Sequence, residues 1–462
     1  MKLKKGDLLE LRVEGVAFGG KGIARVDGIT VFIDNGIPED YVSVRIIKKK
    51  KKYLEARVEA ILEPSPYRVE PECEYSGFCG GCKWQGLQYA KQLEYKRQHV
   101  IDSLEHIGLF SDIKVHATIP SEKIFGYRNK MEFSCSDRRW LLPEELGRDD
   151  IEAGIALGLH VPGTFYKVLD NKYCLLQPDL GNKILNDVQS FIKSSKAPVY
   201  GLRSHEGYWR FLMLRHSAAL DRWMVNIITA AEDRSIVQPL ADLLKNRYPE
   251  IISIVNNIHA GKAGIAVGEY EIKLAGSSNI TERIGKYHFE ISSNSFFQTN
   301  TSGAFKLYEK VKQYAGLTGR ENVLDLYCGT GSIAIFLADQ AKNITGLELV
   351  EGAVRDAEKN CLKNAVSNCR FISGDIRYSL AQITNRPDVM IIDPPRSGMH
   401  KDVVKQVVAA APEKIVYVSC NPATMARDLN LIRNYYKIVE VQPVDMFPHT
   451  YHIESVAKVQ KR

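Results

Sequence analysis

The chain has 462 residues, 45% of them hydrophobic and 25% charged, and its 62 Lys and Arg residues exceed its 55 Asp and Glu residues to give a net charge of +7. This length predicts about three domains, and the composition excludes a fibrous or low-complexity chain. No apolar run approaches the roughly 18 residues of a membrane span, and residues 1–15 lack the apolar core of a secretion signal, so we expect a cytoplasmic protein with no membrane partner.

Residues 1–63 have the pattern of a small β-barrel. Short alternating runs at 8–13 and 30–33 are separated by closely spaced glycines, which suits a tightly wound barrel. The five consecutive lysines over 48–52 form either a solvated loop or an edge that contacts phosphates, and we favour the second interpretation.

The middle of the chain is less regular. Prolines at positions 64, 66 and 71 mark a linker, and residues 88–107 predict one amphipathic helix that ends at Gly108. Mixed β patterns follow from about 113 to 290, with a polar, acidic insertion loop at 141–150.

The last third alternates between strands and helices. Apolar strands are expected at 323–326, 344–347, 371–373, 389–392 and 415–419, with helical patterns between them. This alternation predicts a doubly wound α/β sheet.

A glycine turn follows the first of these strands. Residues 325–331 (DLYCGTG) open a helix there, and glycines let a ligand approach the backbone. Glu348 ends the next strand, where an acid can accept ribose hydroxyls. A packing turn or an NAD site would show similar features. However, the negative charge of Asp325 would repel a pyrophosphate, whereas it would attract the ammonium group of S-adenosylmethionine (SAM). Asp375, after the third strand, is either an adenine contact or a loop cap.

Two further motifs end strands and therefore reach the carboxyl edge of the sheet, where ligands bind in open α/β folds. Residues 393–396 read Asp-Pro-Pro-Arg, and residues 419–422 read Ser-Cys-Asn-Pro. Amino-group methyltransferases place an aromatic residue where this chain has Arg396, so a different chemistry is indicated. Cys420 has no CxxC partner and is a candidate nucleophile. A buried packing cysteine is the alternative, and the location favours the nucleophile.

A thiolate and a carboxylate beside a methyl donor suit methylation of uracil at C5. Attack of Cys420 on C6 would make C5 nucleophilic, and a base must then remove the C5 proton so that the sulfur can leave. Glu454, in the segment PHTYHIE over 448–454, fits this role if desolvation raises its pKa. Arg396 is a candidate for keeping the thiol ionised or for stabilising charge on the uracil O4. The two histidines of the segment could be metal ligands with Glu454, but polar lining is the favoured interpretation.

Nine cysteines in a chain without an export signal indicate metal binding or catalysis rather than disulfides. Three of them, Cys73, Cys79 and Cys82, lie in one glycine-rich loop and could hold iron–sulfur or zinc. Radical SAM enzymes also use three cysteines, but with a different spacing. A fourth ligand could be Cys135 or Cys174, and we choose Cys174 because it is expected in a loop.

With these residues together, the chain resembles the iron–sulfur RNA (uracil-5-)-methyltransferases, in particular the branch acting on large-subunit (23S) ribosomal RNA. The resemblance covers nearly the whole chain and implies an OB-like, RNA-binding TRAM barrel over 1–63. It implies a central mixed β-rich domain carrying a [4Fe-4S] cluster over 72–87 and 113–285. It also implies a Rossmann-like SAM methyltransferase domain over 88–112 and 286–462. Relatives specific for tRNA lack the cysteine cluster, which favours ribosomal RNA as the partner, and no obligate protein partner is expected.

The resemblance also implies roles for individual residues. Cys420 would be the nucleophile and Glu454 the base. The cluster ligands would be Cys73, Cys79, Cys82 and Cys174. The donor-binding residues would be Gln298 in the segment FFQTN, Tyr327, Glu348, Asp375 and Asp393.

Two rival functions compete with uracil methylation. An amino-group methyltransferase could be built around Asp393 and its two prolines, but it would have no use for Cys420 or Glu454. A catalytically silent RNA-binding or ribosome-assembly factor could use the barrel and a structural cluster alone.

Overall fold

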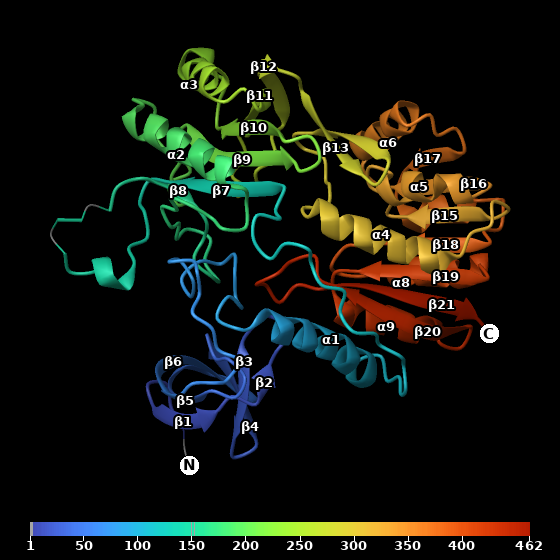
Figure 1. Cartoon of the computed structure of the whole chain (residues 1–462), viewed down its shortest axis with the longest axis horizontal. Helices are drawn as coiled ribbons and strands as arrows, with labels where there is room; N and C mark the ends of the chain where they lie inside the picture. Colours follow the sequence, from blue (N-terminus) through green and yellow to red (C-terminus); the bar gives the residue numbers. More distant parts are fainter. Residues whose placement is uncertain (1–2, 149, 152) are drawn as a thin grey trace.

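A computed structural model describes residues 3–148, 150–151 and 153–462. Residues 1–2 of the expected barrel and residue 149 of the expected insertion loop lie outside these ranges. Figure 1 shows a small barrel, a central sheet with two helices, and a larger α/β layer. Within the described ranges, no helix is both long enough and apolar enough to cross a membrane.

The N-terminal part is a six-stranded sheet with the order β1-β5-β6-β4-β3-β2. Its strands are β1 (Leu8–Arg12), β2 (Gly15–Val16), β3 (Gly22–Val26), β4 (Ile29–Asp34), β5 (Tyr41–Lys49) and β6 (Tyr53–Glu63). Their alternate residues are buried in one core, as the alternating pattern predicts. Gly22 is required by packing, because a Cβ there would lie 2.9 Å from the Gly36 carbonyl oxygen. The lysine run forms the β5–β6 turn and is exposed.

A second six-stranded sheet, with the order β12-β11-β10-β9-β7-β8, forms the middle of the protein. Its strands are β7 (Lys130–Ser136), β8 (Ala156–Gly158), β9 (Trp209–Ser217), β10 (Arg222–Thr229), β11 (Ile251–Ile258) and β12 (Tyr270–Gly276). Helices α2 (Asp179–Ser194) and α3 (Arg234–Arg247) bury their apolar faces against it. The short helix η1 (Pro143–Glu145) lies between β7 and β8, and the hairpin of β13 (Asn279–Ile284) and β14 (Tyr287–Ser292) leads to the last part.

The C-terminal part is a seven-stranded sheet with the order β17-β16-β15-β18-β19-β21-β20. Its strands are β15 (Asn322–Leu326), β16 (Asn343–Glu348), β17 (Cys369–Ser373), β18 (Val389–Ile392), β19 (Lys414–Ser419), β20 (Tyr436–Val444) and β21 (Glu454–Lys461). Strands β15 to β19 are parallel, and β21 runs antiparallel to β19 and β20. The prediction of a Rossmann-like α/β sheet is confirmed.

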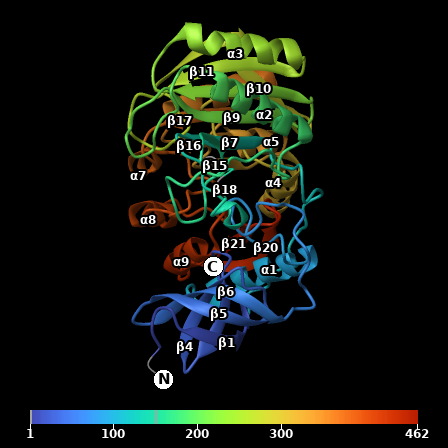
Figure 2. The ribbon, with the colours of Figure 1, turned by 90° about the vertical axis from the view of Figure 1, so that its left-hand side faces the viewer.

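Helices alternate with these strands along the chain. They are α4 (Thr301–Ala315), α5 (Ser332–Leu337), α6 (Glu351–Lys363), α7 (Ile376–Ser379), α8 (Lys401–Ala410) and α9 (Pro422–Ile432), with 3-10 turns η2 (Ala338–Gln340) and η3 (Leu380–Gln382). Helix α1 (Tyr89–His106) precedes the central sheet in sequence but packs against α9 and β20. Figure 2 shows α1 between the barrel and the C-terminal sheet, so it links two parts of the protein.

Candidate active site

The loops that follow β15, β18 and β19 meet at one edge of the C-terminal sheet, because these parallel strands end in register. Strand β21 begins at the same edge, since Ser455 pairs with Ser419. Cys420 therefore follows its strand at the point where Glu454 enters the neighbouring strand. The sheet topology brings both predicted catalytic residues together although 34 positions separate them in the sequence.

A pocket opens beside this edge. Three of the predicted donor-binding residues, Gln298, Tyr327 and Asp393, line it. The rest of its lining is Phe296, Phe297, Tyr308, Asp325, Cys328, Gly329, Thr330, Ser332 and Ile333. Tyr327 adopts a left-handed backbone conformation with φ of 65°, which is strained for a side chain of this size and is typical of functional sites.

Asp325 is almost completely buried at this pocket. Neither carboxylate oxygen accepts a hydrogen bond of normal geometry from the described residues. Burial first, and then the charges of Asp393 and Glu348, raise the pKa of Asp325 well above its usual value, while the Ala334 N–H lowers it. A buried carboxylate without a partner is costly, so this group is poised for a cation.

Two predicted donor-binding residues lie outside the lining of this pocket in the described structure. Glu348 accepts hydrogen bonds from the Gly329 N–H at 3.0 Å and the Val350 N–H at 2.9 Å, so it supports the glycine turn. Asp375 caps α7 through the Arg377 N–H at 2.9 Å and forms an ion pair with the Arg377 guanidinium at 2.5 Å. Asp375 was expected to be either an adenine contact or a cap, and the structure shows it as a cap.

Cys420 is half-buried and lies among charged groups. Burial, followed by the charges of Glu454 and Asp393, raises the pKa of its thiol to about 11, while Arg396 lowers it through charge and a hydrogen bond. The Arg396 carbonyl oxygen accepts hydrogen bonds from Asn421 Nδ2 at 3.1 Å and Thr424 Oγ1 at 3.3 Å. The loop after β18 is thereby tied to the loop after β19, which keeps the guanidinium near the sulfur.

Glu454 is 6% exposed. Burial raises the pKa of Glu454 well above its usual value, the charge of Asp393 raises it further, and Arg396 lowers it. Burial also raises the pKa of Asp393 to about 6. The thiol of Cys420 and the carboxyl groups of Asp393 and Glu454 thus lie in a largely buried setting beside Arg396, which is itself exposed. Perturbed groups gathered in this way are typical of sites of proton transfer and nucleophilic chemistry.

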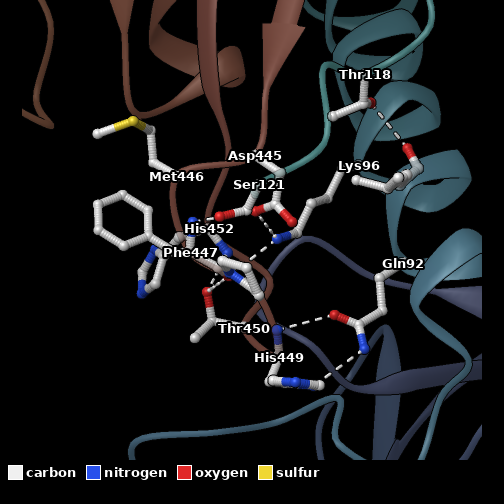
Figure 3. Close-up of polar contacts among 12 residues, drawn as sticks. Gln92, Lys96, Thr118, Ser121, Asp445, Met446, Phe447, His449, Thr450 and His452 are labelled. Atoms are coloured by element: carbon white, nitrogen blue, oxygen red, sulfur yellow. Dashed lines mark hydrogen bonds and ion pairs between the residues drawn. The ribbon is translucent and has the colours of Figure 1, made fainter. Parts of the chain in front are cut away.

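The loop before Glu454 is supported from α1. Lys96 and Asp445 are fully buried, and Lys96 Nζ lies 2.6 Å from Asp445 Oδ1. Lys96 Nζ also donates to the Phe447 carbonyl at 3.0 Å, and the Tyr89 hydroxyl donates to Asp445 Oδ2 at 2.9 Å. Figure 3 shows Lys96 reaching from α1 to Asp445 at the start of this loop and Gln92 reaching to His449 in its middle.

The two histidines of the same loop lie in largely buried settings that disfavour their protonated forms. His449 stacks on Phe125 with ring centroids 4.4 Å apart, and its backbone N–H donates to Gln92 Oε1 at 2.8 Å. Burial lowers the pKa of both His449 and His452 to about 4. These contacts agree with the interpretation of the histidines as polar lining.

Sequence analysis did not identify Lys96 or Asp445. A signal was present in the helix, because Gln92, Lys96, His99 and Ser103 occur on its buried face together with Val100 and Leu104. Four polar residues at the positions of an apolar stripe indicate buried partners, although they do not identify them.

Comparison with known proteins agrees with this geometry. A family model described as tRNA (uracil-5-)-methyltransferase matches residues 274–462, and a TRAM domain model matches residues 2–58. A protein of Chlorobaculum tepidum named an uncharacterized RNA methyltransferase is 42% identical over 99% of this chain and 97% of its own length. One of the same name from Bacteroides thetaiotaomicron is 40% identical over 97% of this chain and 100% of its own length.

The chain belongs to the RNA (uracil-5-)-methyltransferase family. Among solved structures, the methyltransferase is similar to the Pyrococcus abyssi tRNA (uracil-54, C5)-methyltransferase in complex with S-adenosyl-L-homocysteine. The two share 29% identity and a TM-score of 0.76, over 98% of this chain and 100% of that one. The prediction of a SAM-dependent methyltransferase with an N-terminal TRAM domain is confirmed.

SAM fits the pocket of this methyltransferase. The donor carries an ammonium group, and the unpartnered Asp325 carboxylate provides the opposite charge in a buried setting. The backbone at Gly329 is open to a ligand, because no neighbouring atom lies within 4 Å of where a Cβ would be.

The four predicted cluster cysteines of the methyltransferase are close enough to influence one another. Burial raises the pKa of Cys79 to about 12, and negative charge at Cys174, Cys82 and Cys73 raises it further. For Cys135, by contrast, burial alone raises the thiol pKa. The Lys172 N–H donates to the Tyr75 hydroxyl at 3.2 Å, so the segment that carries Cys174 lies beside the loop that begins at Cys73.

An iron–sulfur cluster suits these four residues by donor chemistry. All four donors are sulfur, the Gly81 N–H donates to Cys79 Sγ at 3.4 Å, and the Arg128 cation lowers the pKa of Cys82 and Cys174. In the described part of the chain, no three His, Cys, Asp or Glu side chains are grouped so as to hold a metal ion.

Proposed function

We propose that this methyltransferase methylates C5 of a uridine in 23S ribosomal RNA, in the cytoplasm, through a covalent bond between Cys420 and C6 of uracil. The observation that carries the proposal is the group formed by Cys420, Arg396 and Glu454 beside a pocket that ends at the unpartnered Asp325. An amino-group methyltransferase would have no use for this thiol or for Glu454.

The residues divide the reaction into two halves. The Cys420 thiolate attacks C6, the C5=C6 electron pair moves onto the C4 carbonyl oxygen, and the enolate carbon C5 then takes up the methyl group. Glu454 removes the proton from C5, the double bond re-forms, and the Cys420 sulfur leaves. Arg396 favours the thiolate by its charge. When bound, SAM supplies a methyl group on a sulfonium, and Asp325, Gln298, Tyr327 and Asp393 would orient it.

We further propose that Cys73, Cys79, Cys82 and Cys174 hold a [4Fe-4S] cluster, and that the domains follow the divisions expected from the sequence. The barrel over 1–63 would bind RNA, 72–87 and 113–285 would form the cluster-bearing domain, and 88–112 with 286–462 the catalytic domain. Support comes from the TRAM match and from the packing of α1 on α9. Glu348 and Asp375 stay as candidate donor contacts.

Transfer RNA is the competing substrate, because the similar solved structure is named a tRNA (uracil-54, C5)-methyltransferase. The cysteine cluster favours ribosomal RNA. Mapping 5-methyluridine in ribosomal and transfer RNA from a strain lacking this gene decides between the two. We expect one or more ribosomal sites to lose the modification, whereas a loss confined to tRNA would overturn the choice of substrate.

The pH dependence of methylation tests the role of Cys420. Since burial and nearby carboxylates raise its thiol pKa to about 11, only a small fraction is ionised at neutral pH. We expect kcat/KM for RNA to rise about tenfold per pH unit between about pH 7 and pH 9. In Arg396→Gln, which removes the cation that lowers this pKa, the profile should move to higher pH. A profile that is flat in this range would contradict a thiolate nucleophile with a raised pKa.

Asp325→Asn is expected to weaken binding of S-adenosylhomocysteine about 10- to 100-fold, since a hydrogen bond to a charged group contributes about 1.5–3 kcal/mol. Binding of methylthioadenosine, which lacks the amino acid part, should be unchanged. The ligand-free variant should melt at a higher temperature, because the substitution removes an unpartnered buried carboxyl group. Calorimetry with both ligands measures the effect, and equal losses for the two would contradict the pairing of Asp325 with the ammonium.

Anaerobically purified protein should contain about four iron and four sulfide per chain. Cys174→Ala should lose most of both, and Cys135→Ala, the matched control in a fully buried strand position, should keep them. If Cys135→Ala loses the iron and Cys174→Ala keeps it, Cys135 is the fourth ligand instead. If the wild-type protein contains no iron, the proposal of a cluster is wrong.

A further inference from the structure

Aromatic rings and cations gather on the central domain, away from the candidate active site. This ring surface consists of Trp140, Phe165, Tyr166, Lys167 and Arg203. Lys167 Nζ lies 3.7 Å from the centroid of the Trp140 ring, and Arg203 Cζ lies 3.8 Å from that of Tyr166. Phe165 is 68% exposed and Trp140 40% exposed. Large apolar rings on a surface commonly mark an interaction site.

The backbone holds these rings in place. The Trp140 N–H donates to the Val168 carbonyl at 2.7 Å, and the Val161 N–H donates to the Lys167 carbonyl at 3.0 Å. The segment that carries Phe165 and Tyr166 is thus fastened to the chain that leaves β7. Figure 1 shows the described parts of the β7–β8 connection projecting outward from the central sheet.

The cations of the ring surface are not neutralised by acids. Nearby, Arg139 pairs with Glu145 at 2.9 Å and Arg148 with Asp150 at 2.7 Å. Lys167 and Arg203, in contrast, contact rings, and neither has a carboxylate partner among the described residues. Their positive charge is available to an anionic partner.

The segment over 80–84 connects the chain that carries the ring surface to the loop that leads to Glu454. The Gly80 N–H donates to the His160 carbonyl at 2.9 Å, at the start of the segment that carries Phe165. Three residues later, the N–H groups of Lys83 and Trp84 donate to the His449 carbonyl at 2.9 and 3.0 Å. The three residues from Gly80 to Lys83 span at most about 11 Å, and the five residues from His160 to Phe165 add at most about 17 Å, so several nucleotides would bridge the two places.

We propose that the ring surface stacks unpaired bases of the RNA that flank the target uridine, an inference that rests on the proposed RNA substrate. Aromatic faces and guanidinium planes stack bases that are not in a duplex, and the uncompensated cations would contact the adjoining phosphates. The ring surface therefore selects a single-stranded or looped region next to the modified base.

The test is anisotropy of a labelled 12-nucleotide single-stranded RNA, and of the same RNA in a duplex, with the full-length protein. Trp140→Ala/Tyr166→Ala should weaken binding of the single strand at least about tenfold and leave the duplex unaffected. The matched control is Tyr435→Ala/Lys437→Ala, an exposed ring and lysine at the far end of β20. Lys437 pairs with Gln460 whereas Val444 pairs with Glu454, a separation of about 23 Å along the strand.

A second variant does not depend on removing rings. For the single strand, we plot the logarithm of the affinity against the logarithm of the salt concentration. In Lys167→Gln/Arg203→Gln the magnitude of this slope should fall by about 1.4. Unchanged single-strand binding in both variants, or equal losses in the Tyr435 control, would overturn the proposal. Wild-type methylation tests the proposed function separately: if it occurs and the ring variants bind RNA normally, only the ring surface is wrong.

Discussion

Replacing Cys420 with alanine is expected to lower methyl transfer to RNA by on the order of 10⁴-fold or more, because the loss of a nucleophile removes the covalent route altogether. Binding of S-adenosylhomocysteine should be unchanged, since Cys420 is not part of the pocket lining in the described structure. Transfer of a labelled methyl group and calorimetry measure the two effects.

The matched control for this variant is Cys361→Ala, another free cysteine, which is buried on α6. It should keep the wild-type rate. A Cys420→Ala enzyme that turns over at a rate comparable to this control would exclude covalent catalysis by Cys420.

Replacing Lys96 with methionine is expected to lower the free energy of unfolding by about 3–5 kcal/mol, because it leaves the Asp445 charge buried without its cation. Both side chains are fully buried in the structure, so solvent does not screen the loss. In the double variant Lys96→Met/Asp445→Asn, most of the stability should return, since removing both charges of a buried pair is often nearly neutral. Urea denaturation measures each step.

The same helix supplies the control. Lys91 pairs with Glu94 at the surface at 2.6 Å, with Glu94 61% exposed, and Lys91→Met should leave the free energy of unfolding nearly unchanged because solvent screens the pair. Equal losses for Lys91→Met and Lys96→Met would mean that the buried pair does not hold the loop that leads to Glu454.

The periodicity of apolar residues in the sequence predicted individual elements of the fold, a helix and strands of one sheet. The helix expected over 88–107 is Tyr89–His106, and each expected strand of the catalytic sheet overlaps an observed one. The position of Cys420 at the carboxyl edge followed from the doubly wound fold. Glu454 reaches the same edge because β21 runs antiparallel to β19, and the sequence pattern did not predict that direction.

Contacts between distant segments could not be predicted in this way. Lys96 and Asp445 are 349 positions apart, and only the packing of α1 on the last strands brings them together. Asp375 shows a different difficulty, because a carboxylate after a strand can cap a helix or bind a ligand, and the position of Arg377 determines that it caps α7. The choice between Cys174 and Cys135 likewise depended on whether each lies in a loop or a strand.

The most direct test of the central claim uses RNA that carries 5-fluorouridine at the target position, incubated with SAM and the wild-type protein. Fluorine at C5 cannot be removed as a proton, so the reaction should stop with the protein bound to methylated RNA. Peptide mapping by mass spectrometry should then place the RNA on Cys420. A complex that dissociates on denaturation, or a bond to any other residue, would contradict the account.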